Sequence, residues 1–104
     1  MKKSSVAFSD AAIADILEQS DWYEGQADRS LAQRWEEAVT ATLLRIAQRP
    51  GIGSRCRFTV DELRGTCRVP VAGFAKHLIF YQPRETEILV LRVVHGARDL
   101  ESLF

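Results

Sequence analysis

The chain has 104 residues, 46% of them hydrophobic and 27% charged, with a formal net charge of zero. This length and composition exclude a disordered tail and a disulfide-stabilised miniprotein, and they indicate one globular domain over residues 1–104. No uncharged apolar run approaches the roughly 20 residues of a membrane helix. Asp10 and Asp15 interrupt the only stretch where a signal peptide could lie. We therefore expect a cytoplasmic protein that does not enter a membrane.

Charge and cysteine content argue against a protein that binds many phosphates and against a zinc protein. The second half of the chain is more basic than the first, but there is no overall positive excess of the kind that binding to many phosphates requires. Cys56 and Cys67 form no CxxC motif, so we expect reduced thiols. Together with His77 and His95 they match no standard zinc-ligand spacing. We expect neither a metal nor another cofactor.

The first half of the chain begins with a strand and a helix. Val6 and Phe8 alternate with small or polar neighbours, which predicts a short strand from Ser4 to Phe8. Ser9 then offers a hydroxyl that can cap the free amides of a helix. The apolar spacing that follows predicts a helix from about Asp10 to Tyr23.

A second helix has the clearest periodicity in the chain. Apolar residues recur at spacings of three, four and seven or eight between Leu31 and Ile46, and Pro50 with Gly51 should end the helix. Because few residues join the two helices, we expect an antiparallel hairpin with a shared apolar seam. Three aromatic residues should lie in the core at this seam: Trp22, Tyr23 and Trp35.

From Cys56 onward the pattern is that of extended chain. It predicts three strands, at Arg64 to Val71, Lys76 to Gln82 and Glu87 to His95, whose short turns favour an antiparallel meander. The last two are almost continuously apolar and should lie in the middle of the sheet. The prediction is thus an α+β fold: a short first strand, a helix hairpin, a three-stranded antiparallel meander, and a short C-terminal tail or helix after Gly96. A sheet face left uncovered by the helices would require a partner.

Three residues of these strands are candidates for chemistry. His77 lies within an apolar strand, where a histidine is more often a hydrogen-bonded structural residue than an acid or base. His95 stands at a strand end before a glycine, where both functional and capping histidines occur. Arg92 interrupts an apolar run, so it either pairs with an acidic group or points into a ligand groove. The groove is the interpretation we favour for Arg92.

Two segments carry a resemblance to a known family. GFAKHLIFY, from Gly73 to Tyr81, followed by EILVLRVVHGARDL, from Glu87 to Leu100, resembles the paired core strands of the RelE/ParE toxin superfamily. SDAAIADI, from Ser9 to Ile16, resembles the opening of that superfamily's first helix. The ending VLRVVHGARDL is more similar to the ParE branch and its plasmid-stabilisation relatives than to the RelE ribonucleases. The resemblance implies the toxin of a bacterial type II toxin-antitoxin system.

The two branches imply different activities. RelE toxins cut messenger RNA on the ribosome with basic residues and commonly a tyrosine near the C-terminus, a reaction that needs a base, an acid and cations. Their strand arginine falls near His77, with Lys76 beside it, and the arginine after the last strand is matched by Arg98. The tyrosine position holds Phe104, which cannot transfer a proton. This departure favours the ParE branch, whose members inhibit DNA gyrase by binding.

The leading hypothesis is therefore a ParE-like gyrase inhibitor, without catalysis of its own, that arrests growth unless a cognate antitoxin neutralises it. The resemblance implies that the antitoxin forms a hetero-oligomer with the toxin, supplies its DNA binding, and covers the exposed sheet face and the helix hairpin with a disordered segment that folds as it binds. The alternative is a ribosome-dependent mRNA endoribonuclease that uses His77, His95 and Arg98, and a third possibility is a decayed toxin that only binds its antitoxin. The candidate target-binding residues are Arg68, Lys76, His77, Arg92, His95, Arg98 and Phe104.

Overall fold

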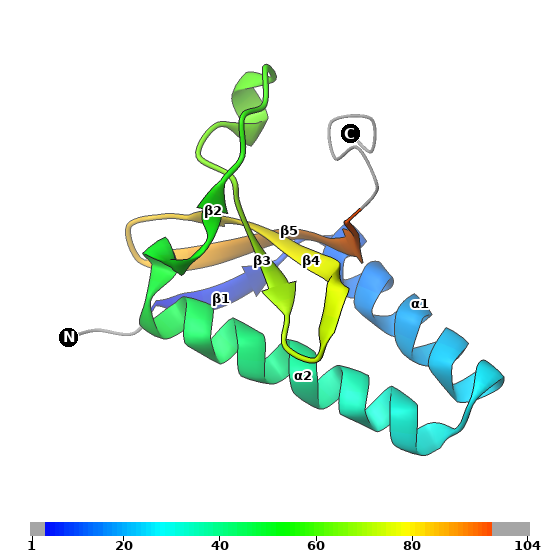
Figure 1. The fold of residues 1–104 in the computed structure, drawn as a ribbon. Coiled ribbons are helices and arrows are strands. Elements are labelled where there is room, and N and C mark those ends of the chain that lie inside the picture. Colours follow the sequence, from blue (N-terminus) through cyan, green and yellow to red (C-terminus); the bar gives the residue numbers. More distant parts are fainter. Residues whose placement is uncertain (1–3, 97–104) are drawn as a thin grey trace.

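A helix hairpin packs against one face of a five-stranded sheet in the computed structural model, which describes residues 4–96 (Figure 1). The predicted α+β fold is confirmed. The helices and strands, in chain order, are β1 (Ser5–Phe8), α1 (Asp10–Gln26), α2 (Arg29–Gln48), β2 (Ser54–Arg55), β3 (Cys67–Val71), β4 (Phe74–Pro83) and β5 (Glu87–His95). Two single 3-10 turns, at Pro50–Ile52 and Asp61–Leu63, flank β2. The predicted tail after Gly96 lies outside the described residues.

Side-chain caps determine where both helices begin. The Ser9 hydroxyl accepts a hydrogen bond from the Ala12 N–H at 3.0 Å, as predicted. α1 continues three residues beyond the predicted end, because Asp28, and not an earlier residue, caps α2 by accepting from the Leu31 N–H at 2.8 Å. The hairpin is antiparallel, and no helix among residues 4–96 is long and apolar enough to cross a membrane.

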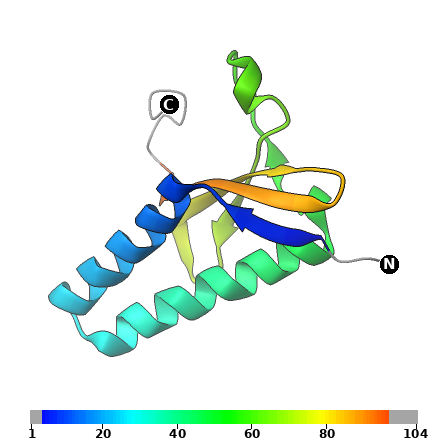
Figure 2. The ribbon, with the colours of Figure 1, turned by 180° about the vertical axis from the view of Figure 1, so that it is seen from behind.

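The sheet has the order β1-β5-β4-β3-β2. β3, β4 and β5 form the predicted antiparallel meander, and β4 and β5 are the central strands, as expected from their apolar sequences. Two features were not predicted: β1 pairs parallel to β5, and β2 adds a fifth strand beside β3 (Figure 2). β3 itself begins at Cys67, three residues later than predicted, because Gly65 with a φ of 81° closes a turn before it.

The hydrophobic core lies between the hairpin and the sheet. Trp35, Ile79 and Tyr81 are fully buried there, and Tyr23 packs against this cluster while remaining half-buried. The prediction for Trp22 was wrong, since its side chain is 57% exposed. Neighbouring helix residues point about 100° apart, so Trp22 and Tyr23 cannot both face the seam.

The opposite face of the sheet has a smaller cluster of its own. Phe80 and Val94 are buried on this face, packed by Cys56 and Phe58 of the arm that follows β2. Figure 1 shows this arm rising on the side of the sheet away from the helices. The chain therefore covers part of the second face itself, where we had expected an antitoxin to provide the covering.

The Tyr81 side chain on β4 bonds to the segment that joins α2 to β2. Its hydroxyl donates to the Pro50 carbonyl at 2.8 Å and accepts from the Gly53 N–H at 3.0 Å. The approach is so close that a Cβ on Gly53 would lie 2.5 Å from the tyrosine oxygen. Burial raises the pKa of Tyr81, so the hydroxyl stays protonated and able to donate.

Replacing Tyr81 by phenylalanine should leave the Gly53 N–H and the Pro50 carbonyl without their partner and lower the free energy of unfolding by about 1–3 kcal/mol. Urea unfolding measures this change. Tyr23→Phe is the matched control, because Tyr23 is only half-buried and should lose less. Equal stability of Tyr81→Phe and the parent protein would contradict the anchoring role.

Candidate functional site

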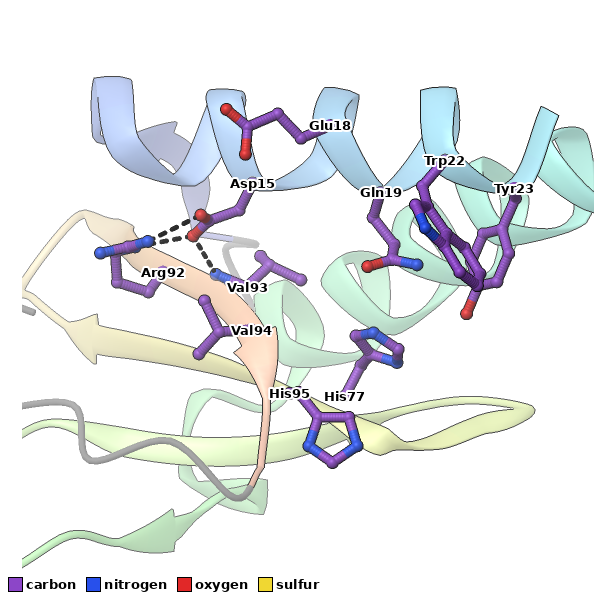
Figure 3. A pocket seen from close by; sticks show the side chains of 10 residues that line it. All are labelled: Asp15, Glu18, Gln19, Trp22, Tyr23, His77, Arg92, Val93, Val94 and His95. Carbon is purple, nitrogen blue, oxygen red and sulfur yellow. Dashed lines mark hydrogen bonds and ion pairs between the residues drawn. The ribbon is translucent and has the colours of Figure 1, made fainter. Parts of the chain in front are cut away.

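A cavity of about 530 Å³ opens between α1 and the ends of β4 and β5 (Figure 3). One wall comes from a single flank of α1, where residues recur at three- and four-residue spacing and so share a side of the helix. The other wall comes from the two strands. The lining residues are Asp15, Glu18, Gln19, Trp22 and Tyr23 from α1, and His77, Arg92, Val93, Val94 and His95 from the strands.

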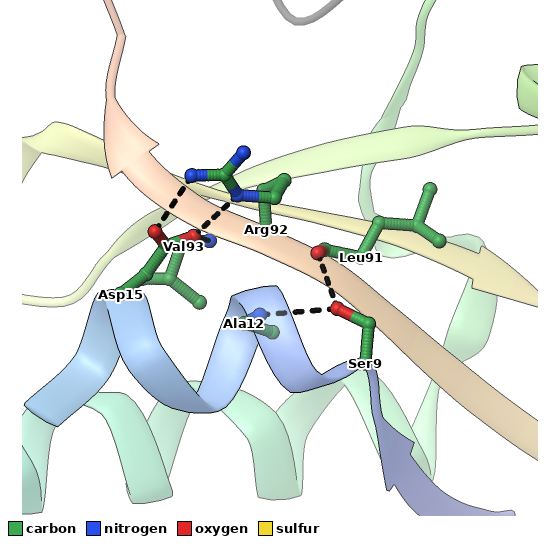
Figure 4. A network of polar contacts seen from close by, with 6 residues as sticks. All are labelled: Ser9, Ala12, Asp15, Leu91, Arg92 and Val93. Atoms are coloured by element: carbon green, nitrogen blue, oxygen red, sulfur yellow. Dashed lines mark hydrogen bonds and ion pairs between the residues drawn. The ribbon is translucent and has the colours of Figure 1, made fainter. Parts of the chain in front are cut away.

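The pocket forms where β1 ends and the start of α1 replaces it as the hydrogen-bonding neighbour of β5. β1 pairs with β5 as far as Val90, and from there the first turns of α1 supply the hydrogen bonds (Figure 4). The Ser9 N–H donates to the Val90 carbonyl at 2.9 Å, and the Ser9 hydroxyl donates to the Leu91 carbonyl at 2.6 Å. The Asp15 carboxylate accepts from the Val93 N–H at 3.0 Å. These bonds fix the position of the first turns of α1 along β5.

Asp15 also holds Arg92. The two side chains form a bidentate pair with distances of 2.7 and 2.8 Å, and their exposures are only 9% and 16%. The hydrogen bonds to Asp15 raise the pKa of Arg92 above its ordinary value, and burial opposes this effect. Arg92 thus takes the first of its two predicted alternatives, an acidic partner, and lines the pocket as a paired group.

His77 and His95 are cross-strand partners on β4 and β5. Their ring centroids are 5.6 Å apart, and the His77 ring lies 4.9 Å from the Trp35 ring in an edge-on contact. Burial, and then the nearby His95, lower the pKa of His77. His77 is therefore a neutral, half-buried imidazole at neutral pH, whereas His95 is exposed.

The other candidates do not join them. Arg68 is the cross-strand partner of Phe80, and Lys76 precedes Leu78 by two residues, so both belong to the sheet face opposite the helices. Arg98 and Phe104 lie outside the described residues.

Sequence reasoning did not identify the α1 side of the pocket. Glu18, Gln19 and Trp22 were not singled out as site residues, although their spacing with Asp15 places them on one flank of the helix. That spacing could have suggested a shared surface, but only the structure shows which strands face it. Residues 4–96 contain no group of three or more potential metal ligands.

Comparison with known proteins identifies the family to which this chain belongs. Residues 6–100 match the family described as the ParE toxin of type II toxin-antitoxin system, parDE. The match spans nearly the whole chain, so the protein belongs to the ParE toxin family, and the resemblance seen in its sequence is confirmed. A solved structure described as the chromosomal ParDE TA system from P. aeruginosa shares the fold, with a TM-score of 0.72 and 16% identity over 89% of this chain and 96% of that chain. No curated sequence is significantly similar to this one.

Removing the Asp15 carboxylate should strongly destabilise the protein. Asp15→Ala leaves the Arg92 guanidinium and the Val93 N–H without their partner, and breaking a buried pair in this way typically costs about 3–5 kcal/mol. Asp61→Ala is the control, because it breaks the exposed pair with Arg64 and should cost less than about 1 kcal/mol. Urea unfolding of both variants measures the difference, and similar losses would contradict a central role for Asp15.

The lowered pKa of His77 should make stability depend on pH. The unfolded chain, with an ordinary histidine pKa of about 6.5, binds the proton more readily than the folded protein. The contribution of His77 is therefore fully present above that pH, and it is lost as the pH falls through the lower folded pKa.

Urea unfolding at a series of pH values measures this effect. As the pH falls, the free energy of unfolding should decrease less for His77→Phe, which cannot titrate, than for the parent protein. His95→Gln removes only the neighbouring imidazole and should keep most of the decline, since burial is the larger cause of the shift. Parallel profiles for His77→Phe and the parent protein would refute this assignment.

Proposed function

We propose that this ParE-family toxin inhibits DNA gyrase by binding to it and that a cognate antitoxin neutralises it. The placement of the cations is the observation that supports binding over RNA cleavage. Cleavage requires an acid, a base and cations around one phosphate. Among the predicted site residues that the structure describes, Arg92 is paired with Asp15, and Arg68 and Lys76 lie on the sheet face opposite the one where His77 packs against Trp35.

That other face is our candidate for the target contact. Arg68 and Lys76 flank a cluster in which Phe80 and Val94 are buried and Cys56, Phe58 and Leu78 are half-buried, so the face combines exposed positive charge with partly exposed apolar side chains. Both lysine and arginine there are exposed. Such a surface suits a protein partner with acidic groups around an apolar contact. Arg98 and Phe104 remain candidate contacts by sequence alone.

A supercoiling assay with purified gyrase tests this proposal. The toxin should inhibit supercoiling and accumulate cleaved DNA, and the double variant R68E/K76E should lose inhibition at least tenfold because it reverses the charge of the proposed surface. Variants H77A and H95A should inhibit as the parent does, once their folding is verified by circular dichroism. Supercoiling that continues unaffected by the parent toxin would exclude gyrase as the target.

The second candidate function is cleavage of mRNA on the ribosome. The pair of histidines 5.6 Å apart is the observation in its favour, because neighbouring imidazoles can supply an acid and a base near neutral pH. In that case translation extracts should show mRNA cleavage by the toxin, lost on His77→Ala or His95→Ala while antitoxin binding persists. We expect no cleavage.

A further inference from the structure

The arm that packs on the second sheet face, residues 56–66, carries an exposed valine. Val60 has a large apolar side chain, and the residue is 39% exposed. The 3-10 turn Asp61–Leu63 follows it directly, and Figure 1 shows this turn near the outer end of the arm. Leu63, by contrast, is buried. The arm therefore has a packed inner side and presents an apolar residue on its outside.

A buried polar network centred on Gln82 of β4 holds the arm in place. Gln82 is only 7% exposed, and its amide nitrogen donates to the Glu62 carbonyl at 2.8 Å. The same nitrogen lies 3.3 Å from the Thr66 hydroxyl, which itself donates to the Leu63 carbonyl at 2.6 Å. The Arg84 guanidinium donates to the Gln82 amide oxygen at 3.2 Å. Because these polar groups have partners on both sides, the network fixes the position of the arm relative to the sheet.

The arm places an apolar group beside a basic surface. Its two arginines and two acidic residues give it no net charge, and Arg64 is paired with Asp61 at 3.1 Å. Exposed positive charge comes from Arg68 and Lys76, on the sheet face against which the arm packs. The contribution of the arm is therefore the exposed Val60 side chain. Charged groups that select a partner and apolar groups that contact it together make a protein interface.

We propose that the arm is a second part of the surface that binds gyrase, with Val60 in contact with an apolar site on the target and Gln82 as the residue that positions the arm. The inference rests on the proposed function, because Val60 has this contact only if the toxin binds gyrase through the same face. Continuity with that face favours the target as the occupant, since the arm packs on the side of the sheet away from the hairpin. The network already orders the arm, so binding to a folded target need not order it.

Supercoiling inhibition by toxin variants tests the contact. Val60→Asp should raise the toxin concentration needed for half-maximal inhibition by about tenfold or more, because it places a charge at an apolar contact and next to acidic groups of the partner. Leu44→Asp is the matched control, since Leu44 is even more exposed, at 56%, and lies on α2, on the other side of the sheet. This control should inhibit as the parent does. Unfolding midpoints verify that both variants are folded at the assay temperature.

The positioning role of Gln82 needs its own readout. Gln82→Glu can keep the contact with Arg84 but cannot donate to the Glu62 carbonyl, so half-maximal inhibition should need about three- to tenfold more toxin. Amide hydrogen exchange should become faster at Leu63 and Thr66, whose N–H groups bond within the arm, and remain unchanged in β4 and β5. When the toxin already carries Val60→Asp, Gln82→Glu should have little further effect on inhibition, since both changes remove the same contact.

Four results would overturn the inference, and they are distinguishable. If the parent toxin leaves supercoiling unaffected, the proposed function fails and the inference fails with it. If the parent inhibits and both Val60→Asp and Gln82→Glu match it, only the inference fails. If Gln82→Glu speeds exchange throughout the sheet, Gln82 stabilises the whole fold and the positioning role is wrong. If Val60→Asp inhibits normally but binds the cognate antitoxin more weakly, the arm belongs to the antitoxin interface and the assignment to gyrase is wrong.

Discussion

The edge of β5 is the constraint on which the rest of this fold depends. A central strand with an open edge would expose unsatisfied backbone groups, and here two different elements satisfy that edge in succession. β1 pairs with it up to Val90, after which Ser9 and Asp15 of the first helical turns continue the hydrogen bonds. Because the same residues begin α1, the position of the helix over the sheet is determined by the strand. The hairpin and the core beneath it follow from that placement.

The pocket is a consequence of this arrangement. α1 leaves the strand edge at an angle, so its later turns stand away from the ends of β4 and β5 and a cavity opens between them. Where α1 lies against β5, the Asp15 and Arg92 side chains pair with each other and stabilise the contact between helix and strand. Further along the same helix flank, Glu18 adds negative charge near Arg92, and the Trp22 ring contacts the Tyr23 ring edge-on while its side chain remains 57% exposed. One flank of one helix therefore has a nearly buried, paired side chain at one end and an exposed aromatic side chain further along.

Local signals predicted much of the fold, and non-local ones limited the rest. The Ser9 cap, the two helices and the central position of β4 and β5 could be predicted because each depends on nearby residues or on apolar content. The parallel pairing of β1 with β5 joins segments about 80 residues apart, and no local pattern specifies its register. The sequence left two alternatives for Arg92, an acidic partner or a ligand groove, and could not decide between them because Asp15 is 77 residues away and only tertiary packing brings it close. The α1 wall of the pocket was missed for the same reason.

The net charge of zero illustrates how a whole-chain quantity can conceal a surface property. The net charge of zero argues against extensive phosphate binding. It does not reveal that the hairpin is acidic and that the sheet and arm are more basic. The fold converts an order along the chain into two faces, because residues 10–48 form the helix layer and the later residues form most of the sheet. A partner that touches both faces encounters fields of opposite sign within one small domain. Such a surface selects for the pattern of charges along a binding segment, and its overall charge matters less.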